Sequence, residues 1–186
     1  MDNLIKRQIS AIVRNEKDLE TIINELMEET VSRHDISIQG SPHDVAAEYG
    51  TSYLNPLILQ KSNHSPKKEP FLHDDFGWVL GFAFSTPFFI GIIIGIFIIG
   101  DLRNTYDVLF YGGWGALIGA LIGLILSLII KAHHNHIISK QEQKGGFALW
   151  ITVTTDDQLN KVKQILKKYH ASHIAIAQLA TDNQEL

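Results

Sequence analysis

The sequence predicts an α+β protein in which two strand-and-helix regions flank a transmembrane hairpin of two helices. Residues 77–100 and 108–130 carry no charged side chain and are separated by only seven residues. At 1.5 Å per residue, either stretch can cross a hydrocarbon core of roughly 30 Å as a helix. Before and after them, the hydrophobic pattern changes from strand to helix and back to strand. These observations predict a membrane hairpin between two βαβ regions.

The first βαβ region covers residues 1–40. Residues 9–14 (ISAIVR) are β-branched and partly alternating, which is typical of a strand. Asn15 can cap a helix that has Asp18 in its first turn. Residues 35–39 (DISIQ) alternate again before Gly40. The predicted helix turns four apolar side chains inward: Leu19, Ile22, Ile23 and Leu26.

Residues 41–76 are expected to form a short helix and a linker next to the membrane. Ser41 and Pro42 are start signals for a helix, and Gly50 is a stop signal. Residues 60–70 are polar and contain proline, so we predict a linker, and its lysines suit an anionic headgroup layer. Aromatic residues prefer membrane interfaces, and the sequence offers one set near each end of the spans: Phe71, Phe76 and Trp78 on one side, and Tyr106, Tyr111 and Trp114 on the other.

After the spans at residues 77–130, residues 131–146 are predicted to continue as a helix that leaves the membrane. The second βαβ region covers residues 147–186. It has a strand at 147–154, a helix capped by Thr155 or Asp156, and a strand at 173–178. The inward side chains of this helix are Leu159, Val162, Ile165 and Leu166.

Two βαβ units together form a ferredoxin-like sandwich, a four-stranded antiparallel sheet with two helices on one face. Neither half alone comfortably builds a core. Because a hairpin of two spans enters and leaves the membrane on the same side, it brings the second βαβ region back to the first. The alternative is two independent amphipathic tails lying on the bilayer, which would make the repeated strand–helix–strand pattern a coincidence.

Lysines near the spans predict the orientation. Lys61, Lys67 and Lys68 precede the first span, and Lys131, Lys140 and Lys144 follow the second. Positive residues favour the cytoplasmic side, so both termini of this multi-pass protein are expected there. No signal peptide is recognisable at the start of the sequence. The sequence has no cysteine, which excludes disulfides and thiolate metal sites.

Small residues recur along both spans and predict close helix packing. In lipid, small side chains let helix backbones approach one another. The packing could hold the hairpin together, or it could join several copies into a homo-oligomer. Because no charged residue lies within the spans, a carrier is disfavoured. The predicted packing residues are Gly77, Gly81, Gly91, Gly95, Gly115, Gly119, Gly123 and Ser127.

One polar cluster could hold a divalent metal ion at the membrane exit. His133, His134 and His136 follow the second span, and Asp74 precedes the first beside His73 and Asp75. Imidazole and carboxylate groups are suitable zinc ligands. The alternative is an interfacial anchor that becomes cationic as pH falls. The usual pair of histidines four residues apart is missing, which favours the anchor.

The sequence shows no catalytic constellation and predicts no enzyme. It contains no glycine-rich phosphate loop, no nucleophile elbow and no zinc-protease helix. The net charge of −4 and the lack of aromatic platforms disfavour nucleic acid as a partner. No cofactor is expected, and any small-molecule or metal ligand stays unknown.

Two segments resemble the bacterial general-stress membrane proteins, a family induced by heat or low temperature. They are AIVRNEKDLETIINELMEETVSRHDISIQG and KQEQKGGFALWITVTTDDQLNKVKQILKKYHASHI, on either side of a glycine-rich hairpin. The resemblance covers most of the chain outside residues 41–75 and includes Gly145-Gly146-Phe147. It implies an inner-membrane protein without catalytic residues to carry over. The Ile- and Phe-rich first span departs from the Gly- and Ala-rich pattern of many members.

These observations lead to one main hypothesis and two alternatives. The main hypothesis is a non-enzymatic, homo-oligomeric membrane protein that acts as a scaffold or sensor in stress adaptation. The first alternative is an oligomeric ion channel or permeation module gated by the cytoplasmic domain. The second is a membrane sensor that responds to a divalent metal ion through the histidine cluster.

Overall fold

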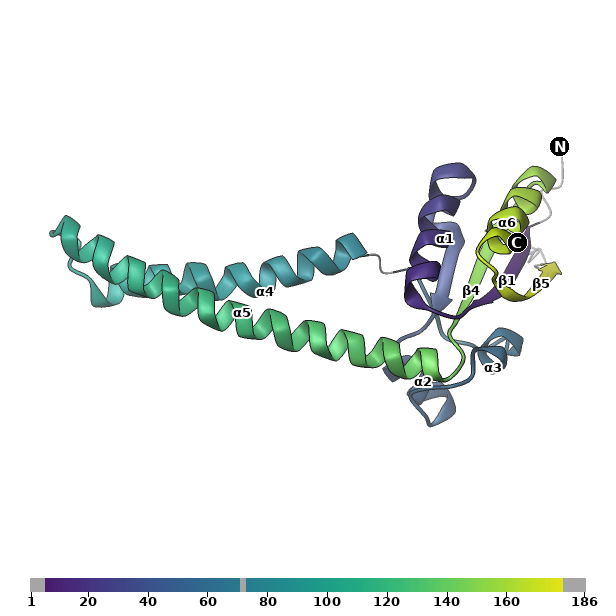
Figure 1. The fold of residues 1–186 in the computed structure, drawn as a ribbon, viewed down its shortest axis with the longest axis horizontal. Coiled ribbons are helices and arrows are strands. Elements are labelled where there is room, and N and C mark those ends of the chain that lie inside the picture. The colour runs from purple at the N-terminus through teal and green to yellow at the C-terminus, as the bar shows by residue number, and fades with distance from the viewer. Residues whose placement is uncertain (1–5, 71–72, 179–186) are drawn as a thin grey trace, which may run out of the picture. The chain divides into compact units, whose positions relative to one another are not determined.

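The computed structural model describes residues 6–70 and 73–178, without the side chains of His73 and Asp74. The chain forms two compact units. One unit combines Met1–Pro70 with Ile137–Leu186, and the other is Phe71–His136. The first contains an antiparallel sheet with helices and the second contains apolar helices (Figure 1), so the predicted α+β class is confirmed.

The sheet has five strands in the spatial order β3-β2-β4-β1-β5. Their bounds are β1 (Arg7–Val13), β2 (Ile36–Gln39), β3 (Lys67–Lys68), β4 (Phe147–Val153) and β5 (Ser172–Gln178). All neighbouring pairs are antiparallel. The four predicted strands are present with ends shifted by one or two residues. The second begins later than predicted because Arg33–Asp35 forms a short 3₁₀ turn, η1.

Strands from before and after the apolar spans pair directly with one another. β1 runs along the whole of β4, from Arg7 opposite Val153 to Val13 opposite Phe147. β4 in turn pairs with β2, where Ile36 lies opposite Ile151. β1 also pairs with β5, with a bulge between Ser10 and Ile12. The N-terminal and C-terminal regions therefore build one sheet.

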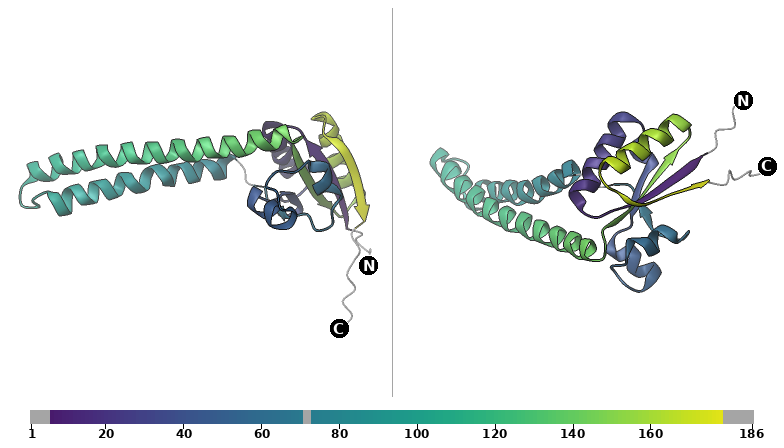
Figure 2. Two further views of the ribbon diagram at one scale, coloured as in Figure 1. Left: turned by 90° about the horizontal axis from the view of Figure 1, so that it is seen from below. Right: turned by 45° about the vertical axis from the view of Figure 1, so that its right-hand side comes forward.

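Two amphipathic helices, α1 (Glu16–Glu29) and α6 (Asp156–Lys168), cover one face of this sheet (Figure 2). Asn15 caps α1 by accepting a hydrogen bond from the Asp18 backbone N–H at 2.8 Å. Thr155, rather than Asp156, caps α6, and its hydroxyl accepts from the Gln158 N–H at 3.2 Å. All eight predicted inward side chains are buried: Leu19, Ile22, Ile23, Leu26, Leu159, Val162, Ile165 and Leu166.

The opposite face carries a smaller apolar cluster under α2 (Pro42–Tyr49) and α3 (Pro56–Lys61). Val45 and Leu59 pack there against Ala148 and Trp150 of β4. As predicted, α2 is capped by Ser41 and ends at Gly50, which has a left-handed backbone with φ 70°.

The predicted linker at residues 60–70 contains regular elements. This segment contains the end of α3 and the edge strand β3. The amide of Gln60 donates hydrogen bonds to Ser10 Oγ at 3.0 Å and to the backbone oxygen of His173 at 2.6 Å. Gly40 N–H donates to the oxygen of Pro66 at 2.7 Å. These polar side-chain and backbone groups attach the segment to the sheet, although its composition gives no periodic signal.

The second unit is an antiparallel pair of helices. α4 (His73–Ile94) contains Pro87 and ends in a π-helical turn, η2 (Gly95–Ile99), closed by a hydrogen bond from Gly100 N–H to Gly95 O at 2.9 Å. α5 (Thr105–Gln143) begins within the predicted connecting loop. The predicted exit helix at 131–146 is the continuation of α5, which ends at Gln143 before Gly145 and Gly146 adopt positive φ angles.

Candidate functional site in the apolar hairpin

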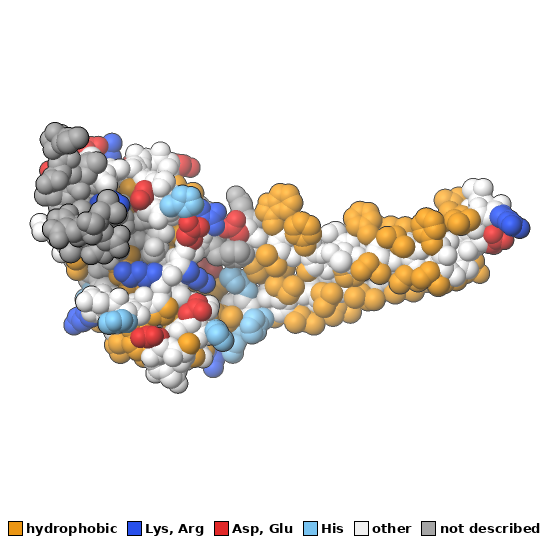
Figure 3. Space-filling view, turned by 180° about the vertical axis from the view of Figure 1, so that it is seen from behind, with side chains coloured by type: hydrophobic (Ala, Val, Ile, Leu, Met, Phe, Trp, Pro, Cys, Tyr) orange, Lys and Arg blue, Asp and Glu red, His pale blue; other side chains and the backbone are white. Residues whose placement is uncertain are grey.

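The second unit exposes an unusual amount of apolar surface (Figure 3). Asp75–Ile99 and Thr105–Gln143 are both long and apolar enough to cross a membrane. Only 6% and 11% of their most apolar windows are buried, which is unlike a core helix of a soluble protein. Among the large apolar side chains described as exposed, all but Ile58 and Ile176 lie between residues 78 and 129.

Glycines bring the backbones of α4 and α5 into direct contact. A Cβ atom built on Gly91 would overlap the backbone oxygen of Gly115, and one built on Gly115 would overlap that of Gly91. In the same way, Gly119 lies against the backbone oxygen of Pro87. Side chains larger than hydrogen therefore cannot occupy these positions unless the helices move apart.

The contact continues toward both ends of the hairpin. Gly123 lies against the backbone oxygen of Phe84, and Gly95 against that of Tyr111. Ser127 donates from its hydroxyl to Gly123 O at 2.9 Å and to Leu80 O at 3.3 Å. The sequence left open whether these small residues join two helices of one chain or several chains. The structure has six of the predicted residues at contacts within one chain.

Two predicted packing residues lie away from this contact. A Cβ atom on Gly77 or Gly81 would meet no described heavy atom within 4 Å, and the same holds for Gly113. Gly81 is about 80° around the helix from Gly91 at 100° per residue. Gly77 is only about 40° around the helix from Gly91. It lies nearer the start of α4 than Leu80, whose backbone oxygen accepts the hydrogen bond from Ser127.

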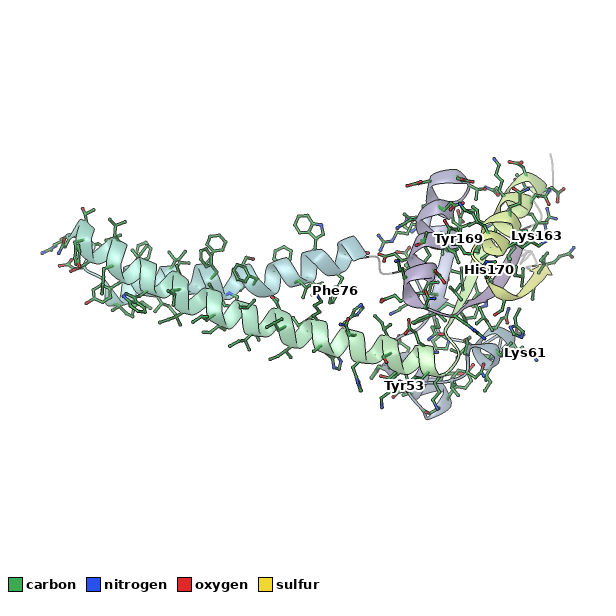
Figure 4. The ribbon with its side chains drawn as sticks, viewed as in Figure 1. Tyr53, Lys61, Phe76, Lys163, Tyr169 and His170 are labelled. Atoms are coloured by element: carbon green, nitrogen blue, oxygen red, sulfur yellow. The ribbon has the colours of Figure 1, made fainter. Side chains whose placement is uncertain are left out.

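Aromatic side chains lie near both ends of the hairpin. Trp78 is 71% exposed and Tyr106 is 70% exposed. The rings of Phe76 and His134 stack with centroids 4.2 Å apart (Figure 4, where Phe76 is labelled). Amphipathic rings prefer the boundary between hydrocarbon and water.

The predicted metal cluster is only partly described. His133 and His136 are exposed, and His134 is half-buried against Phe76. The side chain of Asp74 lies outside the described residues. Among the side chains that are described, no group of three or more metal-ligating residues comes together. The stacked ring of His134 is an interaction that fits the alternative of an interfacial anchor.

The first unit contains a charged cluster that the sequence analysis missed. Lys168 Nζ lies 2.8 and 2.7 Å from the two carboxylate oxygens of Glu25, and the Tyr169 hydroxyl donates to the same carboxylate at 2.5 Å. Figure 4 labels Tyr169. These hydrogen bonds lower the pKa of Glu25, while the bond to Glu25 raises the pKa values of Lys168 and Tyr169. The cluster connects α1 to the end of α6.

We expect this cluster to make the stability of the first unit depend on pH. Because folding lowers the Glu25 pKa, its contribution is present above the unfolded value and is lost as pH falls through the folded value. Because folding raises the Lys168 pKa, its contribution is lost only as pH rises through the folded value. Glu25→Gln should therefore lower the thermal midpoint near neutral pH, and the difference from wild type should shrink in acid.

Thermal unfolding of the full chain between pH 3 and pH 8 measures this difference. Glu28→Gln on the exposed side of α1 is the matched control, because it removes the same charge without touching Lys168. An equal, pH-independent loss in both variants would show that only the net charge matters.

A second missed interaction holds the edge strand β3. Lys67 Nζ lies 4.9 Å from the centre of the Trp150 ring and donates to Gln8 Oε1 at 3.1 Å. Burial lowers the pKa of Lys67. The Trp150 ring attracts the charged form of Lys67. This lysine therefore attaches β3 to the sheet and also gives the edge strand a positive charge.

No family, no curated protein and no solved structure was found to match the chain. The resemblance to the general-stress membrane proteins is therefore carried by the sequence segments alone.

Proposed function

We propose that the chain is an integral protein of the bacterial inner membrane, which it crosses twice through α4 and α5. The observation that carries this proposal is the exposed apolar surface of both helices, with Ile98 74% and Leu109 72% exposed. Leaving one such side chain in water costs roughly 1.5–3 kcal/mol relative to burial. A soluble protein would not keep so many of them on its surface, whereas lipid solvates them.

The topology that we propose puts both termini in the cytoplasm. The lysines before α4 and late in α5 support this orientation, since positive residues are retained on the cytoplasmic side. Residues 101–104 would then form the far turn, where Arg103 N–H donates to Asp101 Oδ1 at 3.0 Å and the turn satisfies part of its own backbone.

We also propose that the first unit is a ferredoxin-like domain divided by the hairpin. The strand order supports it. β1 lies between β4 and β5, and β4 lies between β1 and β2, so the strands of two βαβ units are interleaved. The short β3 is an addition at the β2 edge.

The function that we infer is that of a non-enzymatic scaffold or sensor in stress adaptation, acting as a homo-oligomer at the membrane. Its support is the family resemblance together with the combination of a lipid-facing hairpin and a folded domain. The domain has charged surface helices, with ion pairs such as Arg7 to Asp156 at 2.7 Å. Such a domain can present a surface to partners while the hairpin fixes it at the bilayer.

Cysteine labelling tests the membrane topology, because the chain has no cysteine of its own. Leu102→Cys places a thiol in the turn between the helices, at a position 61% exposed. Ser52→Cys places one in the loop between α2 and α3. In intact cells, an impermeant maleimide should label only the first variant, and after lysis it should label both. Both variants should stay in the membrane pellet after alkaline carbonate extraction.

Two outcomes would contradict the proposal. Release of the protein by carbonate would exclude membrane insertion. Labelling at position 52 but not at position 102 in intact cells would show the opposite topology.

A further inference from the structure

The two edges of the sheet are very different. At one edge, β3 has only two residues, and both are lysines. At the other edge, β5 has seven residues (SHIAIAQ) with no lysine, arginine, carboxylate or proline. Proteins usually protect exposed edges by short strands, lysine or proline, because unpaired backbone groups can pair with another strand. β3 has this protection and β5 lacks it.

The exposed side of β5 is also apolar. Ile176 is 44% exposed and is one of only two large apolar side chains described as exposed in the first unit. Ala175 and Ala177 point to the opposite face of the sheet and are exposed as well. One edge of β5 pairs with β1, and no described strand pairs with its other edge. The backbone groups of residues 174–178 on this outer edge are therefore available for pairing among the described residues. His173 is not part of this regular edge, because it has φ 53° and its backbone oxygen accepts from the Gln60 amide at 2.6 Å.

We propose that β5 pairs antiparallel with β5 of a second copy of this chain, around a two-fold axis at Ala175. This register puts Ile174 opposite Ile176 of the second copy, so apolar side chains meet on one face. β5 contains no lysine and no carboxylate, so no repulsion between like charges opposes this pairing.

The charges of α6 favour the same arrangement. α6 lies on the side of the helical layer nearer β5, whereas α1 lies nearer β2 (Figure 1). Asp156 and Asp157 are at its start, and Lys167 and Lys168 at its end. Asp156, Asp157 and Lys168 also form ion pairs within the chain, with Arg7, Lys161 and Glu25, so attraction between copies would add to these pairs. The two-fold axis makes the α6 helices of the two copies antiparallel. The acidic start of one helix then faces the basic end of the other.

The proposal rests on the homo-oligomeric part of the proposed function but not on membrane insertion. Because the hairpin glycines are used within one chain, the sheet edge provides a separate surface for self-association. If both copies are anchored in one bilayer, their effective concentration is raised, and a small interface then suffices.

Disulfide trapping of the full chain in detergent tests the register. Ala175→Cys places the only cysteine on the two-fold axis, so mild oxidation should give a covalent dimer. Lys68→Cys on β3 is the matched control at the other sheet edge and should give several-fold less dimer. A mixture of Ile174→Cys and Ile176→Cys should form more dimer than either variant alone, because this register places these two positions opposite one another.

The molar mass of the uncrosslinked chain separates the possible results. A dimer or larger assembly with efficient trapping at position 175 supports the proposal. An assembly in which position 175 is trapped no better than position 68 overturns the β5 interface but keeps the homo-oligomer. A monomer with no trapping overturns both.

Discussion

Gly119→Leu is expected to separate α4 from α5, with a cost of roughly 1–3 kcal/mol or more. A Cβ at Gly119 would overlap the backbone oxygen of Pro87, and the atoms nearest to it are all backbone atoms. Backbone cannot rotate away as a flexible side chain can, so the helices must move. Spin labels on cysteines at Ile90 and Ile118, which are 50% and 53% exposed, would report the change as a longer and broader distance distribution.

Gly113→Leu is the matched control for this experiment. It adds the same side chain to the same helix, where no described heavy atom lies within 4 Å of the added Cβ. The label distance should stay as in wild type. If Gly113→Leu widened the hairpin as much as Gly119→Leu, the contact within one chain would not be the one that the glycines serve.

Gly146→Ala is the second change with a large expected effect. Gly146 has φ 103°, which side chains rarely adopt, and an added Cβ would overlap the backbone oxygen of Val13. Backbone strain of this kind costs about 1–3 kcal/mol, and the overlap adds to it. Since Val13 pairs with Phe147, the end of the β1–β4 ladder must open. We expect a loss of about 3 kcal/mol or more in the free energy of unfolding.

Gly50→Ala is the control that has the strain of a positive φ angle without an overlap between the added Cβ and the backbone. Gly50 also has a positive φ, 70°, but open space surrounds the position of its Cβ. It should cost only roughly 1–2 kcal/mol, the penalty of the left-handed backbone. Urea unfolding can be followed by Trp150 fluorescence after Trp78 and Trp114 are replaced with phenylalanine. Equal losses in the Gly50 and Gly146 variants would argue against the backbone overlap.

Periodic patterns in the sequence predicted the regular elements well. Leu19 and Ile22 recur at helical spacing and are buried, and the uncharged spans became two long apolar helices. The hydrophobic period of a helix is repeated over several turns, so a single residue that breaks it does not obscure the pattern. Asn15 was predictable for a different reason, because a cap needs only one side chain at one position.

Interactions that depend on tertiary contacts were not predictable. Lys67 looked like one of several linker lysines, yet it lies over Trp150 in β4. Glu25 and Lys168 each looked like ordinary surface charges, and they meet only because α1 and α6 pack side by side. Nothing local marks such pairs, because their partners are far away in the chain.

In the candidate site of the hairpin, too, the periodic pattern was predictable and the tertiary contact was not. The recurrence of Gly115, Gly119 and Gly123 predicted close packing but could not give the partner. The partner is α4 of the same chain, which approaches through Phe84, Pro87 and Gly91. Phe84 and Pro87 are not small, and they contribute only backbone atoms to these contacts, so a search for small residues could not find them. Asp74 and the histidines stay a prediction, since the Asp74 side chain is not among those described.

The interleaved strand order affects how the protein is made. Ile9 pairs with Ile151 in the centre of the sheet, about 140 residues later in the chain. At about 5–20 residues per second, a ribosome needs roughly 7–30 s to make the segment between them. During that time β1 and α1 are complete, but the strand that must lie beside β1 does not exist. The apolar face of the nascent N-terminal region therefore stays exposed while the hairpin is synthesised. We expect a chaperone to bind this region during that time.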